Sequence, residues 1–592
     1  MDIFELSYLA RYLFVILIVL FVWFLLSHSI SELRWNMKYS VIPARGFFLM
    51  ATESINSRKG DGICLPLFHT TFIGKSSSCD IHIKSRLVAK RHAIIYLFDN
   101  DWFVRPVSTK IPVYVNGMEI NNPMPLENLD VIGIGEASIV FINERQSANE
   151  ASLNYTAHED IPKYPKVLSF PKLLGAFISV NLFTLISGLL TIYMIPEDQE
   201  VAVMYVRSAF IVFFLLSNLY FIFLPMFLHD LDRVLLLVLM QISVIGILFQ
   251  VRLEIGSGIQ TSASQDELIH NLFSQGVSLL IAYLLLPIIT FIVARTHLLE
   301  RIGLFCAVAT PLLLVITLIF GKGADAHGAA LWISMGGMSI QLTEFAKITY
   351  LIVLASFFKN RASRHNQFIF AGWAAMVFLL IFLLPDLGSA MILLPTTLLV
   401  YVVMTSEYIT TLAILLSGSA MGIMAFTLFS HVQRRISGWT TLWSEVNDNN
   451  RQIVYGLQAI ARGGFFGRGV GNGSPGGIPL ASSDMVFAIV CEELGLIAGL
   501  CIVLLFIVVW LRSAKITIAS HDGYSSSLAL GIGTLAFVEA AIVISGVTGL
   551  FPLTGATLPL IARGGSSVLT IIILFAILLG LSARQEKGDL AS

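Results

Sequence analysis

Charged residues are scarce in this sequence. Only 13% of its 592 residues are Asp, Glu, Lys or Arg, whereas soluble domains carry about 25%. Hydrophobic residues make up 56% of the chain, and the mean hydropathy is +0.81. These values exclude a water-soluble enzyme and a disordered chain, and they indicate a polytopic α-helical membrane protein. The net charge of −1 gives no reason to expect a nucleic acid as partner.

Cysteine is also scarce, and its pattern excludes two further classes. The five cysteines form no C-x-x-C pair and have no histidine at the spacing of a metal site; they are Cys64, Cys79, Cys306, Cys491 and Cys501. Three of them lie within apolar runs. We therefore expect reduced, packed thiols instead of the disulfide scaffold of a secreted protein or a metal site.

The first apolar run covers residues 6–26 and is long enough to cross a bilayer. It is too long for the core of a signal peptide and has no small-residue cleavage site after it, so residues 1–28 are expected to remain as a membrane anchor. Cations follow at Arg34, Lys38 and Arg45. The positive-inside tendency therefore predicts an outside N-terminus and a cytoplasmic segment after the anchor.

Residues 47–143 have a different character. Short runs of β-branched and aromatic residues alternate with polar ones, and turn residues such as Asn116-Gly117 separate them. This pattern predicts a small all-β sandwich. Residues 144–172, which contain three prolines, are expected to be a linker to the next membrane segment.

Twelve further apolar segments follow the linker, which gives about thirteen spans with the anchor. They are predicted near residues 173–195, 199–227, 234–251, 272–294, 302–320, 340–358, 368–384, 387–405, 408–430, 485–510, 525–545 and 565–583. An odd number of crossings places the tail, residues 584–592, in the cytoplasm. The charge distribution agrees, because most cations fall in the turns that this topology places inside.

One predicted outer segment, residues 431–483, carries more positive charge than this topology favours. Its arginines are Arg434, Arg435, Arg451, Arg462 and Arg468, and glycines crowd its second half. Arginine side chains and exposed glycine amides are suited to holding phosphate oxygens. Arginines that only touch lipid headgroups, and glycines that only form turns, would explain the same composition.

Several short motifs occur in order within residues 235–583. They are Gly328-Ala329-Ala330-Leu331-Trp332-Ile333, Gln341-Leu342-Thr343-Glu344-Phe345-Ala346-Lys347, Pro385-Asp386-Leu387-Gly388-Ser389, Gly463-Gly464-Phe465-Phe466-Gly467-Arg468-Gly469, Ser483-Asp484-Met485-Val486-Phe487, Glu492-Glu493-Leu494-Gly495, Gly549-Leu550-Phe551-Pro552-Leu553-Thr554-Gly555, Leu558-Pro559 and Gly564-Gly565-Ser566-Ser567. Together they resemble the SEDS family (FtsW, RodA and SpoVE) of peptidoglycan polymerases. The resemblance implies a transmembrane core over residues 234–583, and it leaves a predicted hairpin, residues 173–227, outside the ten-helix core of that family.

The resemblance implies a role for several polar residues. The family's catalytic carboxylate corresponds to Asp484, which would accept the proton of an attacking sugar hydroxyl while a lipid pyrophosphate leaves. The residues implied to hold or orient the substrate are Trp332, Glu344, Lys347, Asp386, Arg434, Arg435, Gln452 and Arg468. No cofactor is expected, and a divalent cation on the pyrophosphate stays open.

Simpler explanations exist for some of these residues. Asp484 would make a good helix N-cap. Glu344 and Lys347 lie three positions apart on one helix face, where a buried structural ion pair, with Asp386 as a further member, would also account for them. Trp332 has the character of an aromatic residue at a membrane interface.

The chain also departs from the family pattern near its end. Glu539, Val543 and Ala562-Arg563 stand where the family has Gln, Asn and Ser-Tyr. An acid in place of a neutral amide needs a partner, and we expect Glu539 to pair with Arg563.

The predicted sandwich resembles a forkhead-associated (FHA) domain. The motifs that carry this likeness are Ile73-Gly74-Lys75, Asp80-Ile81-His82-Ile83, His92-Ala93, Val115-Asn116-Gly117 and Leu129-Asp130-Val131-Ile132-Gly133-Ile134-Gly135. FHA domains read phosphothreonine through Arg, Ser and Asn, where this chain has Lys75, Ala89 and Lys110. The degenerate surface would consist of Lys75, Ala89, Lys90, Arg91, His92, Lys110 and Asn116. Docking that does not depend on phosphorylation is the favoured interpretation, and a weakened phosphopeptide reader is the alternative.

These inferences predict a peptidoglycan glycosyltransferase that polymerises lipid II at the outer face of the cell membrane and is regulated or recruited through a cytoplasmic FHA module. The implied partners are lipid II, the lipid-linked glycan, a class B penicillin-binding transpeptidase and a cytoplasmic protein bound by the FHA module. A lipid II flippase and a non-enzymatic membrane scaffold are the two alternatives. The sequence does not distinguish roles in elongation, division and sporulation.

Overall fold

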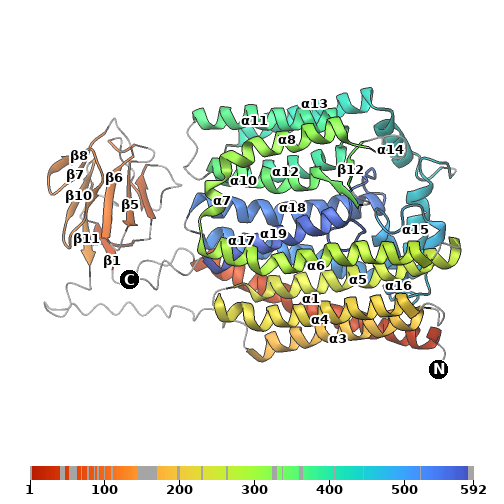
Figure 1. Ribbon diagram of the computed structural model, residues 1–592. Coiled ribbons are helices and arrows are strands. Elements are labelled where there is room, and N and C mark those ends of the chain that lie inside the picture. The colour runs from red at the N-terminus through yellow and green to blue at the C-terminus, as the bar shows by residue number, and fades with distance from the viewer. Residues whose placement is uncertain are drawn as a thin grey trace. The chain divides into compact units, whose positions relative to one another are not determined.

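The chain forms two compact units (Figure 1). The computed structural model describes residues 3–584 except 40–46, 52–62, 144–169, 323–329 and shorter gaps of one to five residues. One unit is helical and comprises residues 1–34 and 165–590, and the other comprises residues 35–164 and 591–592. The predicted linker lies almost entirely outside the described residues, as does the tail after residue 584.

The smaller unit is the predicted β-sandwich. Its strands are β1 (Phe47–Ala51), β2 (Ile63–Pro66), β3 (Thr70–Gly74), β4 (Ile81–His82), β5 (Ala93–Phe98), β6 (Asp101–Pro106), β7 (Val113–Val115), β8 (Met118–Ile120), β9 (Met124–Pro125), β10 (Val131–Ile134) and β11 (Ala137–Asn143). They form one sheet in the order β2-β1-β11-β10-β7-β8 and a second in the order β4-β3-β5-β6-β9. Period-two patterning explains the core, because Trp102 and Val104 are buried while Asp101 and Arg105 face outward.

The larger unit consists of long helices. Those at least fifteen residues long are α1 (Ile3–Tyr39), α3 (Phe170–Met194), α4 (Glu200–Phe227), α5 (Arg233–Thr261), α6 (Gln265–Arg295), α8 (Gly303–Phe320), α10 (Leu342–Phe358), α11 (Arg364–Leu383), α12 (Leu387–Thr405), α13 (Tyr408–Leu428), α17 (Leu496–Ala519), α18 (Gly523–Val547) and α19 (Gly565–Arg584). Eleven helices of the described chain are long and apolar enough to cross a membrane.

The prediction of about thirteen spans differs from this number for two identifiable reasons. Helix α10 has 17 residues and carries Glu344 and Lys347, and the apolar part of α11 covers only residues 369–383. A third predicted span, residues 485–510, is divided into a short helix, α16 (Val486–Leu494), and α17. The break falls at Gly495, which has φ +89°, a conformation that favours glycine.

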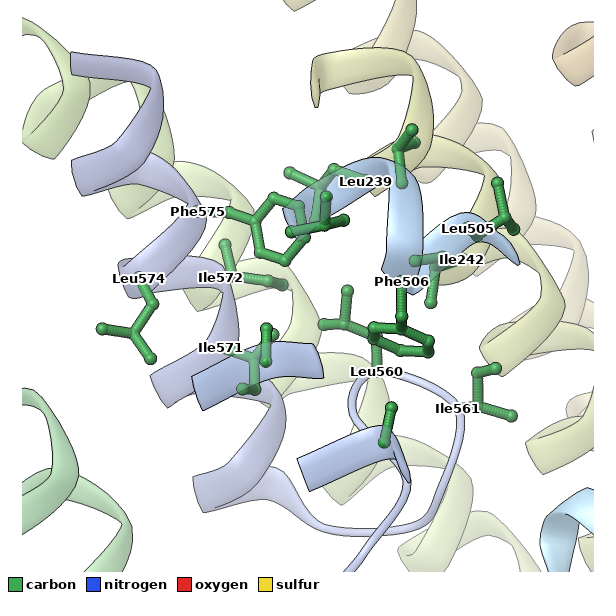
Figure 2. Packing of buried hydrophobic residues seen from close by; sticks show 14 of the residues in the cluster. Leu239, Ile242, Leu505, Phe506, Leu560, Ile561, Ile571, Ile572, Leu574 and Phe575 are labelled. Atoms are coloured by element: carbon green, nitrogen blue, oxygen red, sulfur yellow. The ribbon is translucent and has the colours of Figure 1, made fainter. Parts of the chain in front are cut away.

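Helix α5 lies at the centre of the helical unit. The most apolar stretch of α5 is buried along its whole length. This explains why the sequence of α5 is continuously hydrophobic and not amphipathic. Figure 2 shows Leu239 and Ile242 of α5 close to Phe506 of α17 and Phe575 of α19. The core is therefore formed by helices that are far apart in the sequence.

The anchor helix α1 is bound to the rest of the helical unit near both of its ends. Near its start, the Arg11 guanidinium donates to the Gly467 carbonyl. Near its end, Glu32 accepts hydrogen bonds from Arg512 and from Lys515, whose Nζ lies 3.0 Å away. Between these contacts, Phe14 packs on Phe183 of α3 with ring centroids 4.6 Å apart. Residues 1–28 are therefore an integrated part of the helical unit.

Short elements gather at one end of the helical unit, which we call the site end. These are α14 (Ser430–Thr440), α15 (Arg451–Gly463), α16 and a hairpin of β12 (Trp332–Met335) and β13 (Met338–Gln341). Figure 1 shows them at the same end as the start of α1. Because successive long helices run in opposite directions, α1 and α19 both end at the other end of the unit.

Candidate active site

Asp484 lies at the site end in the turn that precedes α16, and it is half-buried. Hydrogen bonds from the backbone N–H groups of Ser483 and Met485 to the Leu480 carbonyl (both 3.2 Å) close this turn. The N-cap position of α16 is Met485, whose side chain makes no capping hydrogen bond, and Asp484 precedes it by one residue. The interpretation of Asp484 as a helix N-cap thus places the cap one residue before the position observed.

Arg435 of α14 brings two acids into one site. Burial lowers the pKa of its guanidinium, while the negative charges of Asp484 and Asp386 act in the opposite direction. Because an arginine pKa lies above 12 in ordinary surroundings, the guanidinium stays charged. The structure thus brings together three of the predicted site residues, which come from the turn before α16, from α14 and from the turn before α12.

The guanidinium of Arg435 is held over the loop that precedes α19. It donates a hydrogen bond to the Thr554 carbonyl and lies against Gly555, where an added Cβ would come within 2.8 Å of Nη2. Gly555 also has φ +73°. A glycine is needed here both for the backbone conformation and for the approach of the arginine.

Asp386 has a structural contact of its own. Its carboxylate accepts hydrogen bonds from the Ser389 N–H (3.0 Å) and from the Ser389 hydroxyl (2.6 Å), so it caps the first turn of α12. It also lies at the edge of a small cavity, about 90 Å³, that α11, α12 and α13 line with apolar side chains. The carboxylate is thereby fixed in orientation between Arg435 and an apolar pocket.

Lys347 was predicted to contact the pyrophosphate, and the structure pairs it with two acids of the chain itself. Its side chain is buried, and Nζ lies 2.8 Å from Oε1 of Glu344 and 2.8 Å from Oε1 of Glu539. Two acids therefore enclose the ammonium group, which supports the interpretation of Glu344 and Lys347 as a buried structural ion pair. The expected pairing of Glu539 with Arg563 is wrong, because Arg563 Nη1 lies 2.8 Å from Glu254 Oε1.

Replacement of the buried lysine tests this assignment. Lys347→Met is expected to lower the free energy of unfolding by about 3–5 kcal/mol, because it leaves two buried carboxylates without a counter-charge. Denaturant unfolding of the purified chain in detergent measures the change. Adding Glu344→Gln and Glu539→Gln should restore part of the loss. Normal stability in Lys347→Met together with lost activity would instead assign the lysine to the substrate.

The remaining predicted substrate residues occupy different surroundings. Arg434 is exposed on α14, next to Arg435. Gln452 lies on α15, and its Nε2 is buried with no hydrogen-bond partner in the part of the chain that the structure describes. Trp332 is half-buried in the β12–β13 hairpin, where it pairs with Gln341. Of these three, Arg434 is the one on the same helix as Arg435.

The glycine-rich loop is organised around two buried acids. Glu493 accepts hydrogen bonds from the N–H groups of Gly471 (2.9 Å) and Gly473 (3.3 Å), and Arg252 Nε lies 3.1 Å from its carboxylate. Arg468, predicted to hold substrate, lies 3.8 Å from the Glu492 carboxylate. Two of the glycine amides expected to bind phosphate, those of Gly471 and Gly473, are thus occupied by a carboxylate of the chain itself.

Two residues near the site escaped the sequence analysis. The Gln250 amide of α5 donates to the carbonyls of Ser482 (3.2 Å) and Ile561 (2.6 Å), and so supports the turn that carries Asp484. His431 of α14 has a lowered pKa, because burial and the charge of Arg435 disfavour its protonated form. Helical spacing from Arg435 would have pointed to His431, whereas no sequence signal pointed to Gln250.

The predicted FHA surface is only partly described. Lys90, Arg91 and Lys110 lie outside the described residues, and Lys75 is exposed. The Ala89 carbonyl accepts a hydrogen bond from the Lys75 N–H (2.9 Å). Of the four predicted cations, Lys75 is the one that the structure describes, and its side chain is exposed.

Two of the predicted surface residues have structural roles. His92 is fully buried: its Nδ1 accepts from the Ala89 N–H (3.1 Å), and its Nε2 lies 3.2 Å from the Pro112 carbonyl. Asn116 occupies a left-handed position in the β7–β8 turn, and its amide donates to Asp130 (2.8 Å). His92 is therefore not on the surface, whereas Asn116 is exposed and its place in the predicted peptide-binding surface stays a prediction.

The buried histidine makes the sandwich sensitive to acid. Burial lowers the pKa of His92, which the hydrogen bond to Pro112 offsets in part. The stabilisation is therefore complete above the unfolded pKa of about 6.5 and is lost as the pH falls below it. Hydrogen exchange on the full chain should show β5 and its neighbours opening more readily as the pH falls through this range. His92→Gln should weaken this dependence, and an unchanged pH profile in that variant would contradict the assignment.

The site therefore combines three charged groups at one end of the helical bundle. They are the half-buried carboxylate of Asp484, the guanidinium of Arg435 and the carboxylate of Asp386, which caps α12. Such a set is suited to removing a proton from a hydroxyl and to binding an anionic leaving group. Among the described residues, no group of three or more His, Cys, Asp or Glu is placed to hold a metal ion.

Comparisons with known proteins identify the family of the helical core and of the sandwich. Residues 232–587 match a family model described as cell cycle protein (FtsW, RodA and SpoVE), and residues 71–135 match the FHA domain. The peptidoglycan glycosyltransferase RodA of Mycobacterium tuberculosis is 33% identical, over 51% of this chain and 67% of the relative. Stage V sporulation protein E of Bacillus subtilis is 34% identical, over 46% of this chain and 76% of the relative.

One solved structure shares the fold of the helical core. A chain from a study of polymerization and crosslinking by a peptidoglycan synthase complex superposes with a TM-score of 0.50 at 22% identity. The superposition covers 60% of the present chain and 99% of the solved chain. The additional helices at the N-terminal side of residue 232 have no counterpart in the family match.

Proposed function

Because the chain belongs to the FtsW/RodA/SpoVE family and carries an FHA domain, we propose that it is a peptidoglycan glycosyltransferase that joins the disaccharide units of lipid II into glycan strands. Its relatives are named as peptidoglycan glycosyltransferases. The observation that carries the site assignment is the electrostatic interaction of the Asp484 carboxylate with the Arg435 guanidinium at the site end of the bundle.

The proposed reaction is a displacement at an anomeric carbon. A hydroxyl oxygen of one sugar forms a bond to that carbon while the bond from the carbon to the lipid pyrophosphate breaks. Asp484 takes the hydroxyl proton. Arg435, with exposed Arg434 beside it, neutralises the negative charge that develops on the departing pyrophosphate.

The neighbouring groups set up this pair for the reaction. Asp386 is locked by Ser389 and keeps the guanidinium oriented toward the site. The Gln250 amide fixes the Ser482 carbonyl, two residues before the proposed base. A base and an anion-binding group held by such contacts need little reorganisation when the substrate arrives.

We place the site end at the outer face of the membrane and the FHA module in the cytoplasm. The other end of the helical unit carries Arg295, Arg301, Arg512, Lys515 and Arg584, which supports a cytoplasmic location by the positive-inside tendency. The chain leaves α1 and enters α3 at that end. An outer N-terminus and a cytoplasmic C-terminus are consistent with this orientation.

Two partners follow from the proposed function. A solved neighbour belongs to a peptidoglycan synthase complex that couples polymerization to crosslinking, which supports a class B penicillin-binding transpeptidase as partner of this chain. The FHA domain supports docking of a cytoplasmic protein. The divergent Lys75 and Ala89 favour docking that does not depend on phosphothreonine, and titration calorimetry with a phosphothreonine peptide tests it. Micromolar binding would contradict that choice.

A single reconstitution tests the proposed activity against its alternatives. Purified chain in liposomes is supplied with lipid II, and products are separated on a gel while translocation of a labelled lipid II is followed in parallel. We expect glycan polymer. Translocation without polymer would support the flippase instead, and the absence of both from a folded chain with its transpeptidase partner would support a scaffold.

A further inference from the structure

A cavity of about 290 Å³ lies between the additional hairpin and the family core. Its walls are residues 205–216 of α4, residues 243–254 of α5 and residues 273–283 of α6, and the loop before α19 closes it with Leu560 and Ala562. The family match begins at residue 232. The α4 wall therefore lies outside the family match, and the proposed glycosyltransferase chemistry assigns it no role.

The depth of the cavity matches one leaflet of a bilayer. Along α5 it extends from Ser243 to Glu254, which at 1.5 Å per residue is about 16 Å. Half of the hydrocarbon core of a membrane is about 15 Å. Since α5 runs toward the site end, Glu254 marks the membrane surface on that side and Ser243 marks the bilayer centre.

Most polar groups along the cavity are already paired. The Tyr283 hydroxyl donates to the Ser243 hydroxyl at 2.9 Å, near the deep end. Glu254 binds Arg563 at the shallow end. The deep part thus presents mainly hydrocarbon, from side chains such as Val212, Phe213 and Leu279, which suits an apolar ligand in a membrane.

One buried polar atom on the wall still lacks a partner. Gln250 is 9% exposed, and its amide nitrogen donates to two carbonyls while Oε1 has no hydrogen-bond partner in the described chain. A buried acceptor without a donor is unfavourable. It lies one helical turn deeper than Glu254, where the polar end of an amphiphile that enters from the leaflet would reach it.

From these observations we propose that the cavity binds one hydrocarbon chain of an amphiphilic lipid from the leaflet at the site end. The polar head of the lipid lies at the end of the cavity lined by Gln250 and Glu254. Two sources share this chemistry, a bilayer phospholipid and a polyprenyl phosphate. The polar head thus lies beside Gln250, the residue that supports the turn of Asp484, so the additional hairpin connects lipid binding to the site.

Photolabelling of the full chain in vesicles tests the proposal. One arm uses phosphatidylglycerol with a diazirine at mid-chain, and the other uses a polyprenyl phosphate with a diazirine on its tail. Labelled residues are mapped by mass spectrometry. We expect adducts on the cavity-facing residues of α4 and α6, which an excess of the unlabelled lipid removes. Adducts with the first probe alone identify a bilayer phospholipid, and preferential adducts with the second identify the polyprenyl source.

Filled-cavity variants provide the matched comparison. Ala209→Trp and Gly276→Phe place bulk in the cavity from two different helices, and no atom lies within 4 Å of a Cβ added at Gly276. Ile211→Trp and Leu284→Phe place the same bulk on exposed positions of the same helices. Labelling should fall about tenfold in the first pair and stay near the wild-type level in the second, with melting temperatures measured for all four.

Two outcomes would overturn the proposal. Equal labelling of the filled and control variants would mean that the probes reach only the outer surface of the helices. Wild-type adducts that excess unlabelled lipid does not reduce would likewise exclude a specific site, and this comparison needs no variant. Neither readout depends on glycan synthesis, so the result stands apart from the proposed activity.

Discussion

Asp484→Asn is expected to lower the rate of glycan polymerisation by about 10²–10⁴-fold, because the amide cannot accept the proton of the attacking hydroxyl. The side chain keeps its size, and Asp484 lies one residue before the N-cap position of α16, which is Met485. Single-turnover formation of glycan from lipid II measures the rate, and the melting temperature should stay close to that of the wild type. Binding of lipid II should be weakened much less than turnover, because the effect falls on the transition state.

The segment before Asp484, residues 431–483, supplies the control. Asp448 is fully exposed, and its nearest cation in the described contacts, Arg451, lies 3.9 Å away. Asp448→Asn should leave polymerisation near the wild-type rate. If both asparagine variants were equally active, Asp484 would not be the base and the assigned chemistry would have to move to another carboxylate.

Arg435→Met should reduce polymerisation by about 10²–10³-fold, as expected when a group that stabilises transition-state charge is lost. The change removes the only charge shown to interact with both Asp484 and Asp386 in the described residues, and it also frees the Thr554 carbonyl. Arg435→Lys should recover part of the activity, because lysine keeps the charge but not the geometry of the guanidinium. Turnover of lipid II under saturating conditions separates the variants.

Arg451→Met is the matched control for this second change. Arg451 begins α15 in the same outer segment, and its side chain is half exposed. A nonspecific requirement for positive charge near lipid headgroups would make Arg451→Met as damaging as Arg435→Met. That outcome would refute a specific role for Arg435 in pyrophosphate departure.

Several features of the fold were predictable because they depend on local pattern. The apolar runs and the period-two segment gave the two kinds of architecture without any long-range information. The division of residues 485–510 into α16 and α17 was missed, because Gly495 acts through its backbone conformation and the run is apolar on both sides. Helices α10 and α11 were predicted as spans, but their apolar parts are shorter than those of the eleven helices long enough to cross a membrane.

The site was only partly predictable, because pairing of charges depends on tertiary neighbours. Asp484, Arg435 and Asp386 are more than forty residues from one another in the sequence, and motif likeness alone brought them together. The partners of Lys347 and Arg468 could not be inferred, since Glu539 and Glu492 approach them from other helices. Lysine is suited to phosphate binding, but Lys347 neutralises the two acids of the chain that enclose it.

The anchor helix links the two ends of the helical unit. As a single helix of 37 residues, α1 would be about 55 Å long, with a salt-bridge cluster at Glu32 and a hydrogen bond to Gly467 near its start. One continuous helix therefore joins the salt-bridge cluster at Glu32 to the carbonyl of Gly467 in the glycine-rich loop.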